Sequence, residues 1–137
     1  MSCFWDSILA KMPRDALQTV CGDTQKMTPV HLIRGFQRML REGRSACGPD
    51  TTWQGQKITE KMRAEMHEWM RDYETSRFNR GTDTSTCNPW FLFLVTHFDV
   101  DIVHHFMGVK LVYSRQPQRQ EGHPVVLTFR SNRGHIS

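Results

Sequence analysis

The fold class follows most directly from residues 124–137, PVVLTFRSNRGHIS. Its first half, 124–130, is rich in β-branched residues and is typical of a strand. A turn containing glycine follows, and His135 comes directly after it. Residues 109–114, VKLVYS, alternate apolar and polar side chains and predict a second strand, with 115–123 as a hairpin-like connection. This end of the chain is therefore expected to form a sheet.

The preceding part of the chain is dominated by helical patterns. Apolar residues recur at three-to-four spacing in three segments, which predicts helices over 4–12, 28–43 and 55–75. Pro13 is expected to end the first helix, and the pair Thr28 and Pro29 supplies an N-cap and a first-turn proline for the second. Together with the strands, these helices predict a single α+β domain over residues 1–137.

Four segments between these elements complete the prediction. Polar and turn-forming residues make loops of 44–53 and 76–88. Residues 89–98, PWFLFLVTHF, are apolar on all sides, so periodicity leaves a buried helix and a buried strand equally open. Asp99 is expected to cap a short helix that ends at Gly108.

Composition limits the classes of partner and cofactor. The 137 residues carry a net charge of +4, but lysine and arginine are interleaved with acidic residues, so no nucleic-acid partner is expected. The sequence contains no secretory signal pattern and no apolar run of membrane-spanning length, which predicts a cytoplasmic protein without a membrane partner. The four cysteines form no C-x-x-C pair, so neither a disulfide framework nor a metal site is expected, and no other cofactor.

Two residues near opposite ends of the chain are candidates for nucleophilic catalysis. Cys3 stands at the start of the first predicted helix, where the helix dipole favours a thiolate. Its alternative role is that of a small buried apolar residue. A cysteine nucleophile needs a base that is near in space, and His135 follows a strand and a turn as such a base would. The alternative role of His135 is that of a solvent-exposed residue in a C-terminal tail.

The other cysteines and the adjacent histidines are weaker candidates. A structural or surface role is expected for Cys21, and a surface thiol in a loop for Cys47 and Cys87. His104 and His105 are neighbours on the short helix predicted after Asp99, where their side chains would point in different directions. They are therefore not expected to bind a metal together.

Three segments resemble parts of the ovarian-tumour (OTU) family of cysteine deubiquitinases. CFWDSI (3–8) is similar to the family's cysteine-box helix, DVDIVHHFMGVKLVYS (99–114) to its late helix, glycine turn and core strand, and PVVLTFRSNRGHIS to its last strands with the catalytic histidine. The resemblance implies a papain-like OTU fold, a small twisted sheet flanked by helices. It also implies a viral member of the family, as encoded by large, iridovirus-like DNA viruses, acting as a monomer in the host cytoplasm to evade immunity.

The activity implied by this resemblance is hydrolysis of the isopeptide or peptide bond after the C-terminal glycine of ubiquitin. Cys3 would be the nucleophile and His135 the base, with Ser137 or Asn132 orienting the imidazole. Substrate contacts would come from Ser2, Phe4 and Trp90. The implied partners are ubiquitin, polyubiquitin chains and ubiquitin-like modifiers.

One departure from the family keeps an alternative function open. Family members carry an Asp-Gly loop before the nucleophile, whereas only Met1 and Ser2 stand before Cys3 here. A catalytically inactive ubiquitin-binding or protein-interaction module is therefore the alternative.

Overall fold

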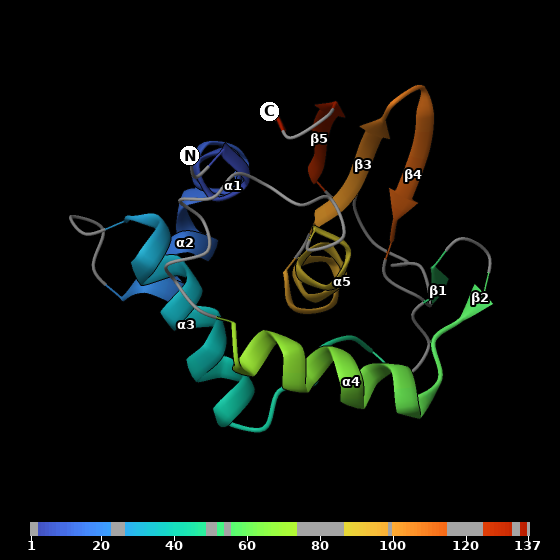
Figure 1. Ribbon diagram of the computed structural model, residues 1–137. Coiled ribbons are helices and arrows are strands. Elements are labelled where there is room, and N and C mark those ends of the chain that lie inside the picture. Colours follow the sequence, from blue (N-terminus) through green and yellow to red (C-terminus); the bar gives the residue numbers. More distant parts are fainter. Residues whose placement is uncertain are drawn as a thin grey trace.

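The computed structural model describes residues 3–22, 27–48, 52–53, 56–73, 87–98, 100–114, 125–132 and 135–136. For eight residues within these elements the description covers the backbone alone: Cys3, Thr52, Trp53, Gln56, Cys87, Asn88, Asn132 and His135. The elements follow in the order α1 (Cys3–Lys11), α2 (Arg14–Cys21), α3 (Pro29–Arg41), β1 (Thr52–Trp53), β2 (Gln56–Lys57), α4 (Glu60–Arg71), α5 (Cys87–His97), β3 (Val100–Phe106), β4 (Val109–Tyr113), β5 (Val125–Asn132) and β6 (His135–Ile136). Helices and a small sheet thus make an α+β protein, as predicted (Figure 1).

The first predicted helices are confirmed, and their ends have the expected local causes. Helix α1 ends just before Pro13. Helix α3 starts after Thr28, whose side chain accepts a hydrogen bond from the backbone N–H of His31, and Gly43 follows its end with a φ of 91°. Helix α2 was not predicted. Pro13 stops α1 but also precedes α2 in an extended conformation (φ −55°, ψ 140°), so one proline separates two helices.

Helix α4 is shorter than the helix predicted over 55–75. It begins at Glu60, after Thr59, whose side chain accepts a hydrogen bond from the backbone N–H of Met62. The residues ahead of it form a small antiparallel hairpin, in which Thr52 pairs with Lys57 and Trp53 with Gln56. The start of the predicted helix is therefore a strand, and part of the predicted 44–53 loop is its partner.

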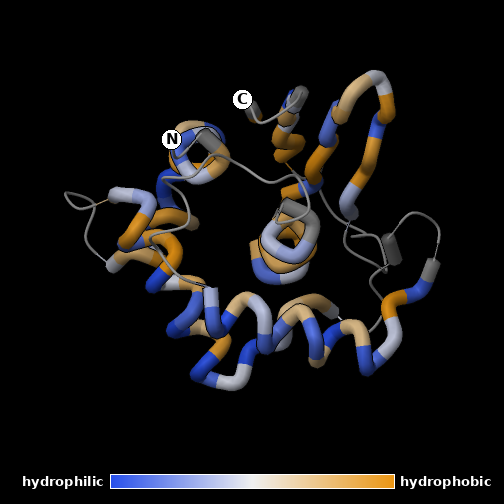
Figure 2. Tube along the Cα trace, viewed as in Figure 1, coloured by the Kyte–Doolittle hydropathy of each residue, from blue (hydrophilic) through white to orange (hydrophobic). Residues whose placement is uncertain are grey.

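The ambiguous apolar segment is helix α5, and it forms the centre of the molecule. Every side chain from Trp90 to Val95 is buried. Figure 1 shows α5 end-on between the sheet on one side and α3 and α4 on the other, and Figure 2 shows its turns as predominantly hydrophobic, whereas both residue types alternate along α3 and α4. A helix that is apolar all round belongs inside the core. Of the predicted 76–88 loop, Cys87 and Asn88 belong to α5, and the remainder lies outside the described residues.

The main sheet has four strands in the order β4-β3-β5-β6. Strand β3 pairs antiparallel with β4 and parallel with β5, and β5 pairs antiparallel with β6. The predicted hairpin between 109–114 and 124–130 is therefore wrong, because β3 lies between the two strands. Residues 115–124, which connect them, lie outside the description.

The short helix predicted between Asp99 and Gly108 is also wrong, because this segment is strand β3 and a tight turn. Its residues alternate in burial, with one set facing the core: Val100, Ile102 and His104. Phe106 pairs with Val109 across a turn in which Met107 and Gly108 have φ values of 47° and 84°. Two positive φ values identify a type I′ hairpin turn, so Gly108 serves a hairpin rather than a helix end. The resemblance to a late helix at 99–108 is lost with this correction.

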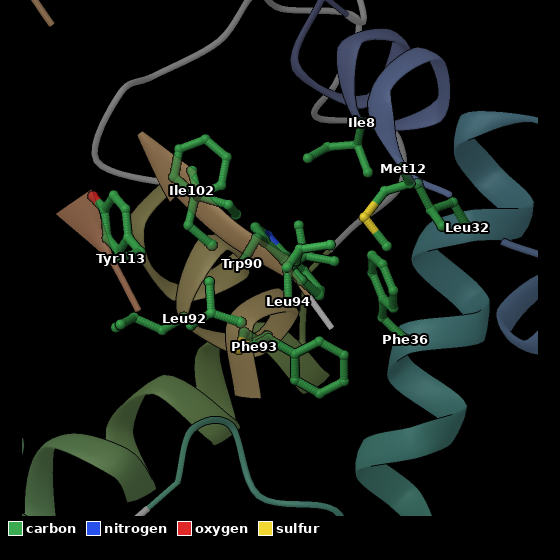
Figure 3. Close-up of a cluster of buried hydrophobic side chains, with 14 of the residues drawn as sticks. Ile8, Met12, Leu32, Phe36, Trp90, Leu92, Phe93, Leu94, Ile102 and Tyr113 are labelled. Atoms are coloured by element: carbon green, nitrogen blue, oxygen red, sulfur yellow. The ribbon is translucent and has the colours of Figure 1, made fainter. Parts of the chain in front are cut away.

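The core joins the helices to one face of the sheet (Figure 3). Phe91 of α5 contacts rings on β3, β4 and β5, with centroid distances of 5.3 Å to His104, 5.3 Å to Tyr113 and 4.8 Å to Phe129. Trp90 of α5 packs edge-on against Trp5 of α1, with a centroid distance of 5.0 Å, and at a tilt against Phe36 of α3, at 5.7 Å. Helix α5 therefore holds α1, α3 and the sheet in one body.

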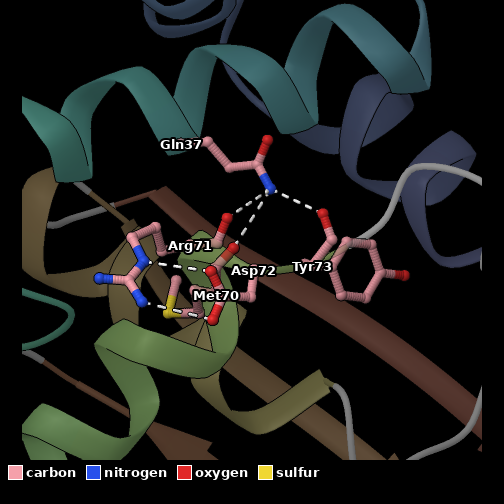
Figure 4. Close-up of polar contacts among 5 residues, drawn as sticks. All are labelled: Gln37, Met70, Arg71, Asp72 and Tyr73. Atoms are coloured by element: carbon pink, nitrogen blue, oxygen red, sulfur yellow. Dashed lines mark hydrogen bonds and ion pairs between the residues drawn. The ribbon is translucent and has the colours of Figure 1, made fainter.

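A buried amide ties α3 to the end of α4 (Figure 4). Nε2 of Gln37 donates toward the carbonyls of Met70 and Arg71, both at 3.3 Å, and of Tyr73 at 2.8 Å. The last carbonyls of a helix have no partner within it, so the Gln37 side chain acts as a C-terminal cap supplied by another helix.

Candidate functional site

Helix α1 and strand β6 lie side by side. Helix α1 contacts β6, and Ser7 Oγ donates a hydrogen bond of 3.5 Å to the carbonyl of Ile136. Cys3 is the first residue of α1 and lies one turn before Ser7 on the same side of the helix. His135 is the residue before Ile136. The fold thus brings together the two segments that carry the predicted nucleophile and base.

Strand β6 owes its position to its pairing with β5. Ser131 pairs with Ile136, and Asn132 pairs with His135. Asn132, one of the two predicted orienting residues, is therefore the cross-strand neighbour of His135. The other, Ser137, lies outside the described residues, as does Ser2.

The N-terminus of α1 offers further groups near Cys3. Backbone N–H groups in the first turn of a helix have no acceptor within the helix, and they carry the positive end of the helix dipole. A thiolate or a developing oxyanion at this position would be stabilised by both. Such donors are the usual means of holding the oxyanion in acyl transfer.

Phe4 and Trp90, the predicted substrate contacts, are core residues. Their side chains are 3% and 1% exposed. Phe4 packs edge-on against Trp5 and Phe91, with centroid distances of 5.0 and 5.4 Å. Because these rings contact other rings instead of a surface, their contribution is to fix α1 against α5, and the substrate-binding prediction for them is corrected.

Cys47 and Cys21, in the helical half of the chain, are not activated as nucleophiles, because the pKa of each thiol is raised. Cys47 is fully buried, which corrects the prediction of a surface thiol, and burial raises its pKa to about 11 against a smaller opposing effect of Arg63. Cys21 is half-buried at the last residue of α2, where burial raises its pKa despite Arg38 nearby. A helix C-terminus also disfavours a thiolate. Cys87 begins α5 and does not lie in a loop.

His104 and His105 lie on a strand, so they point to opposite faces of the sheet. His104 is buried and its Nε2 lies 2.6 Å from Ser131 Oγ, whereas His105 is half-buried. Within the described residues, no group of three or more metal-ligating side chains converges. Sequence analysis missed the link between His104 and Ser131, although the spacing of Val100, Ile102 and His104 is a period-2 signal for a common face.

Two shallow grooves follow α4. The smaller, about 360 Å³, is lined by the rings of Trp69 and Tyr73 and by acidic side chains; the larger, about 720 Å³, is lined by charged residues of α4 and by residues 45–46. Neither of these two grooves includes a residue of α1 or β6. Among the described helices, none is both long and apolar enough to cross a membrane.

Comparison with known proteins leaves the family open. No family model, no curated protein and no solved structure matches this chain.

Proposed function

We propose that this protein is a thiol hydrolase of ubiquitin conjugates, with an OTU-like, papain-type arrangement of Cys3 and His135. The observation that supports the proposal is the packing of α1 on β6, with Ser7 hydrogen-bonded to the carbonyl of Ile136. A helix that begins with cysteine and a strand that begins with histidine meet there from opposite parts of the chain. A cysteine–histidine pair of this kind is how thiol hydrolases activate their nucleophile.

In the proposed reaction, the Cys3 thiolate attacks the carbonyl carbon of ubiquitin's C-terminal glycine. His135 holds the thiol proton and passes it to the departing lysine amine, so that a thioester remains on Cys3. Water adds to the thioester, His135 accepts its proton, and the ubiquitin carboxylate and the thiol are released. Backbone N–H groups of the first turn of α1 would hold the oxyanion, and Asn132, opposite His135, would orient the imidazole. Ser137 is the other candidate for orientation.

The proposed substrates are ubiquitin, polyubiquitin chains and related modifiers, in the cytoplasm of a cell infected by the virus that would encode this protein. These assignments rest on the resemblance of residues 3–8 and 124–137 to the OTU family. The predicted helix at 99–108 is lost from that resemblance, whereas the glycine turn and the strand that follows it are present.

The test is labelling with a ubiquitin whose C-terminal glycine carries an electrophile, together with turnover of a C-terminal ubiquitin reporter. Wild-type protein is expected to form one covalent adduct on Cys3, and Cys3→Ala is expected to lose both the adduct and turnover. Cys87→Ala is the matched control, because Cys87 also begins a helix, and it is expected to keep both.

Other outcomes of the same experiment would contradict the proposal. An adduct that persists in Cys3→Ala and disappears in Cys87→Ala would assign the nucleophile to α5. Reversible ubiquitin binding without any adduct would identify the alternative, an inactive ubiquitin-binding module.

A further inference from the structure

A buried histidine and a buried serine are joined across the two central strands of the sheet. His104 on β3 is 2% exposed, Ser131 on β5 is 8% exposed, and Nε2 of the imidazole lies 2.6 Å from the serine Oγ. In the parallel register of β3 and β5, His104 pairs with Phe129, and Ser131 lies two residues beyond Phe129, on the same face of the sheet. This is a short hydrogen bond in the core, where most polar groups are paired.

The surroundings of His104 favour the neutral imidazole. The rings of Phe91 and Phe106 lie 5.3 and 6.0 Å from it, and the paired residue on β4 is Leu111, so these three neighbours carry no charge. Burial, with a smaller effect of His105 on the opposite face, lowers the pKa of His104. Nδ1 is buried without a hydrogen-bond partner among the described residues. Because an unpaired N–H is rarer in cores than an unpaired acceptor, Nε2 is assigned as the donor to Ser131.

Ser131 is the point at which three parts of the fold meet. Its side chain binds His104, its carbonyl accepts a hydrogen bond of 3.3 Å from the N–H of Met107 in the β3–β4 turn, and it is the β5 residue paired with Ile136 of β6. Ile136 in turn accepts the hydrogen bond from Ser7 of α1. A continuous series of contacts therefore runs from the buried imidazole through Ser131 and β6 to the helix that begins with Cys3.

We propose that His104 and Ser131 are positioning residues, which fix the end of β5 so that β6 holds His135 against the first turn of α1. Strand β6 is only two residues long and pairs with β5 at two positions, so its place depends on how firmly that end of β5 is held. The hydrogen bond from His104 fixes the Ser131 side chain inward, and the backbone of Ser131 thereby keeps its register with Ile136. This inference rests on the proposed function, because it assigns to the pair the placement of the proposed base.

The experiment measures how readily the Cys3 thiol is alkylated at each pH, because a nearby His135 lowers the pH at which the thiol reacts. Iodoacetamide alkylation of Cys3 is followed across pH by mass spectrometry of its peptide, which separates it from the other cysteines. The variants are Ser131→Val and Ser131→Thr, which have the same shape and differ only in the hydroxyl, with His104→Phe and His135→Ala. Thr128→Val on the exposed side of β5 is the control for a changed strand residue.

In wild type the alkylation midpoint is expected below that of an ordinary thiol, and His135→Ala should raise it. Ser131→Val and His104→Phe should raise it part of the way, by about 0.5–1 pH unit, which corresponds to about 3–10-fold slower alkylation below the midpoint. Ser131→Thr and Thr128→Val should keep the wild-type curve. Because the two positioning residues act through one bond, the double variant Ser131→Val/His104→Phe should shift no further than either single variant.

Two results would overturn the inference, and they differ from each other. If His135→Ala raises the midpoint while Ser131→Val and Ser131→Thr give the same curve, the proposed catalytic pair stands and the positioning role is wrong. If His135→Ala leaves the midpoint unchanged, the proposed pair is wrong and the positioning role is lost with it. Where Ser131→Val fails to fold, Ser131→Ala replaces it against the same Ser131→Thr reference.

Discussion

Replacing Gln37 by methionine should destabilise the protein without leaving a large cavity. The two side chains have similar length, but the thioether donates no hydrogen bond, so the carbonyls of Met70, Arg71 and Tyr73 lose the donor that now lies 3.3, 3.3 and 2.8 Å away. An amide NH2 has two hydrogens and can satisfy two of these acceptors at once. At about 1 kcal/mol net for each bond, with a further contribution from carbonyls left partly buried, the expected loss is about 2–3 kcal/mol.

Thermal unfolding followed by circular dichroism, with urea unfolding for the free energy, measures this loss. For a chain of 137 residues the expected fall in Tm is about 6–12 °C, from a few degrees for each kcal/mol. Arg34→Met, on the exposed side of the same helix, is the control for helix propensity and should change the free energy by no more than about 0.5 kcal/mol. A Gln37→Met variant as stable as Arg34→Met would refute the idea that this amide caps α4.

Gln37→Glu gives a second check with a pH signature. A carboxylate at the same place would face carbonyl oxygens, so its folded-state pKa should be raised above about 4.3. A carboxyl group whose pKa is raised by folding contributes less to stability as pH rises through the range between its unfolded-state and folded-state pKa values. The stability deficit relative to wild type should therefore be larger at pH 7 than at pH 4.

Three further predictions concern other parts of the core. Gly35→Ala should destabilise the protein by about 1–3 kcal/mol in urea unfolding, because a Cβ would lie 2.5 Å from both the Val20 side chain and the Val20 carbonyl oxygen. This loss is expected although alanine is the better helix former. Adding Val20→Ala should restore only part of the stability, since the carbonyl oxygen remains. Cys47 should resist iodoacetamide at pH 8 in the native protein and react after unfolding in urea, because its side chain is buried and its pKa is raised to about 11. A rapid reaction of the native protein would show that the core around Cys47 opens readily. Burial lowers the pKa of His104 in the folded state, so as pH falls the unfolded chain takes up a proton before the folded protein does. The free energy of unfolding should therefore decrease as pH drops below about 6.5. The fall in Tm between pH 7 and pH 5 should be smaller in His104→Gln than in wild type, and an equal fall would assign the acid sensitivity to other groups.

Local sequence signals were sufficient to predict a helix or strand where one short segment determines it. The Thr28–Pro29 pair and Gly43 delimit α3 by capping and by backbone conformation alone. The type I′ turn at Met107 and Gly108 is also local, but glycine after an apolar run is equally typical of a helix end. The two interpretations could not be separated without knowing what lies beside the segment.

Strand β3 illustrates what the sequence could not supply. Its residues fit a helical stripe through Ile102, Val103 and Phe106 as well as they fit a strand. Pairing with β4 on one edge and β5 on the other selects the strand, and both partners lie later in the chain. Non-local pairing of this kind overrides local preference.

The same distinction applies to the candidate site. Cys3 at a helix start was readable from its neighbours, because helix α1 is set by local spacing. Its nearness to the His135 segment depends on the contact of α1 with β6, and the pairing of His104 with Ser131 depends on the parallel register of β3 and β5. Those relations join residues far apart in sequence, so no short pattern records them.

The contact between α1 and β6 has a consequence for synthesis on the ribosome. Ser7 and Ile136 are separated by 129 positions, and at about 5–20 residues per second β6 is translated about 6–26 s after α1. Helix α1 can pack against α3 during this interval, but its β6 neighbour does not yet exist. The candidate catalytic pair therefore forms only after β6 has left the ribosome, and a nascent chain that lacks β6 should not show the alkylation behaviour expected of Cys3 beside His135.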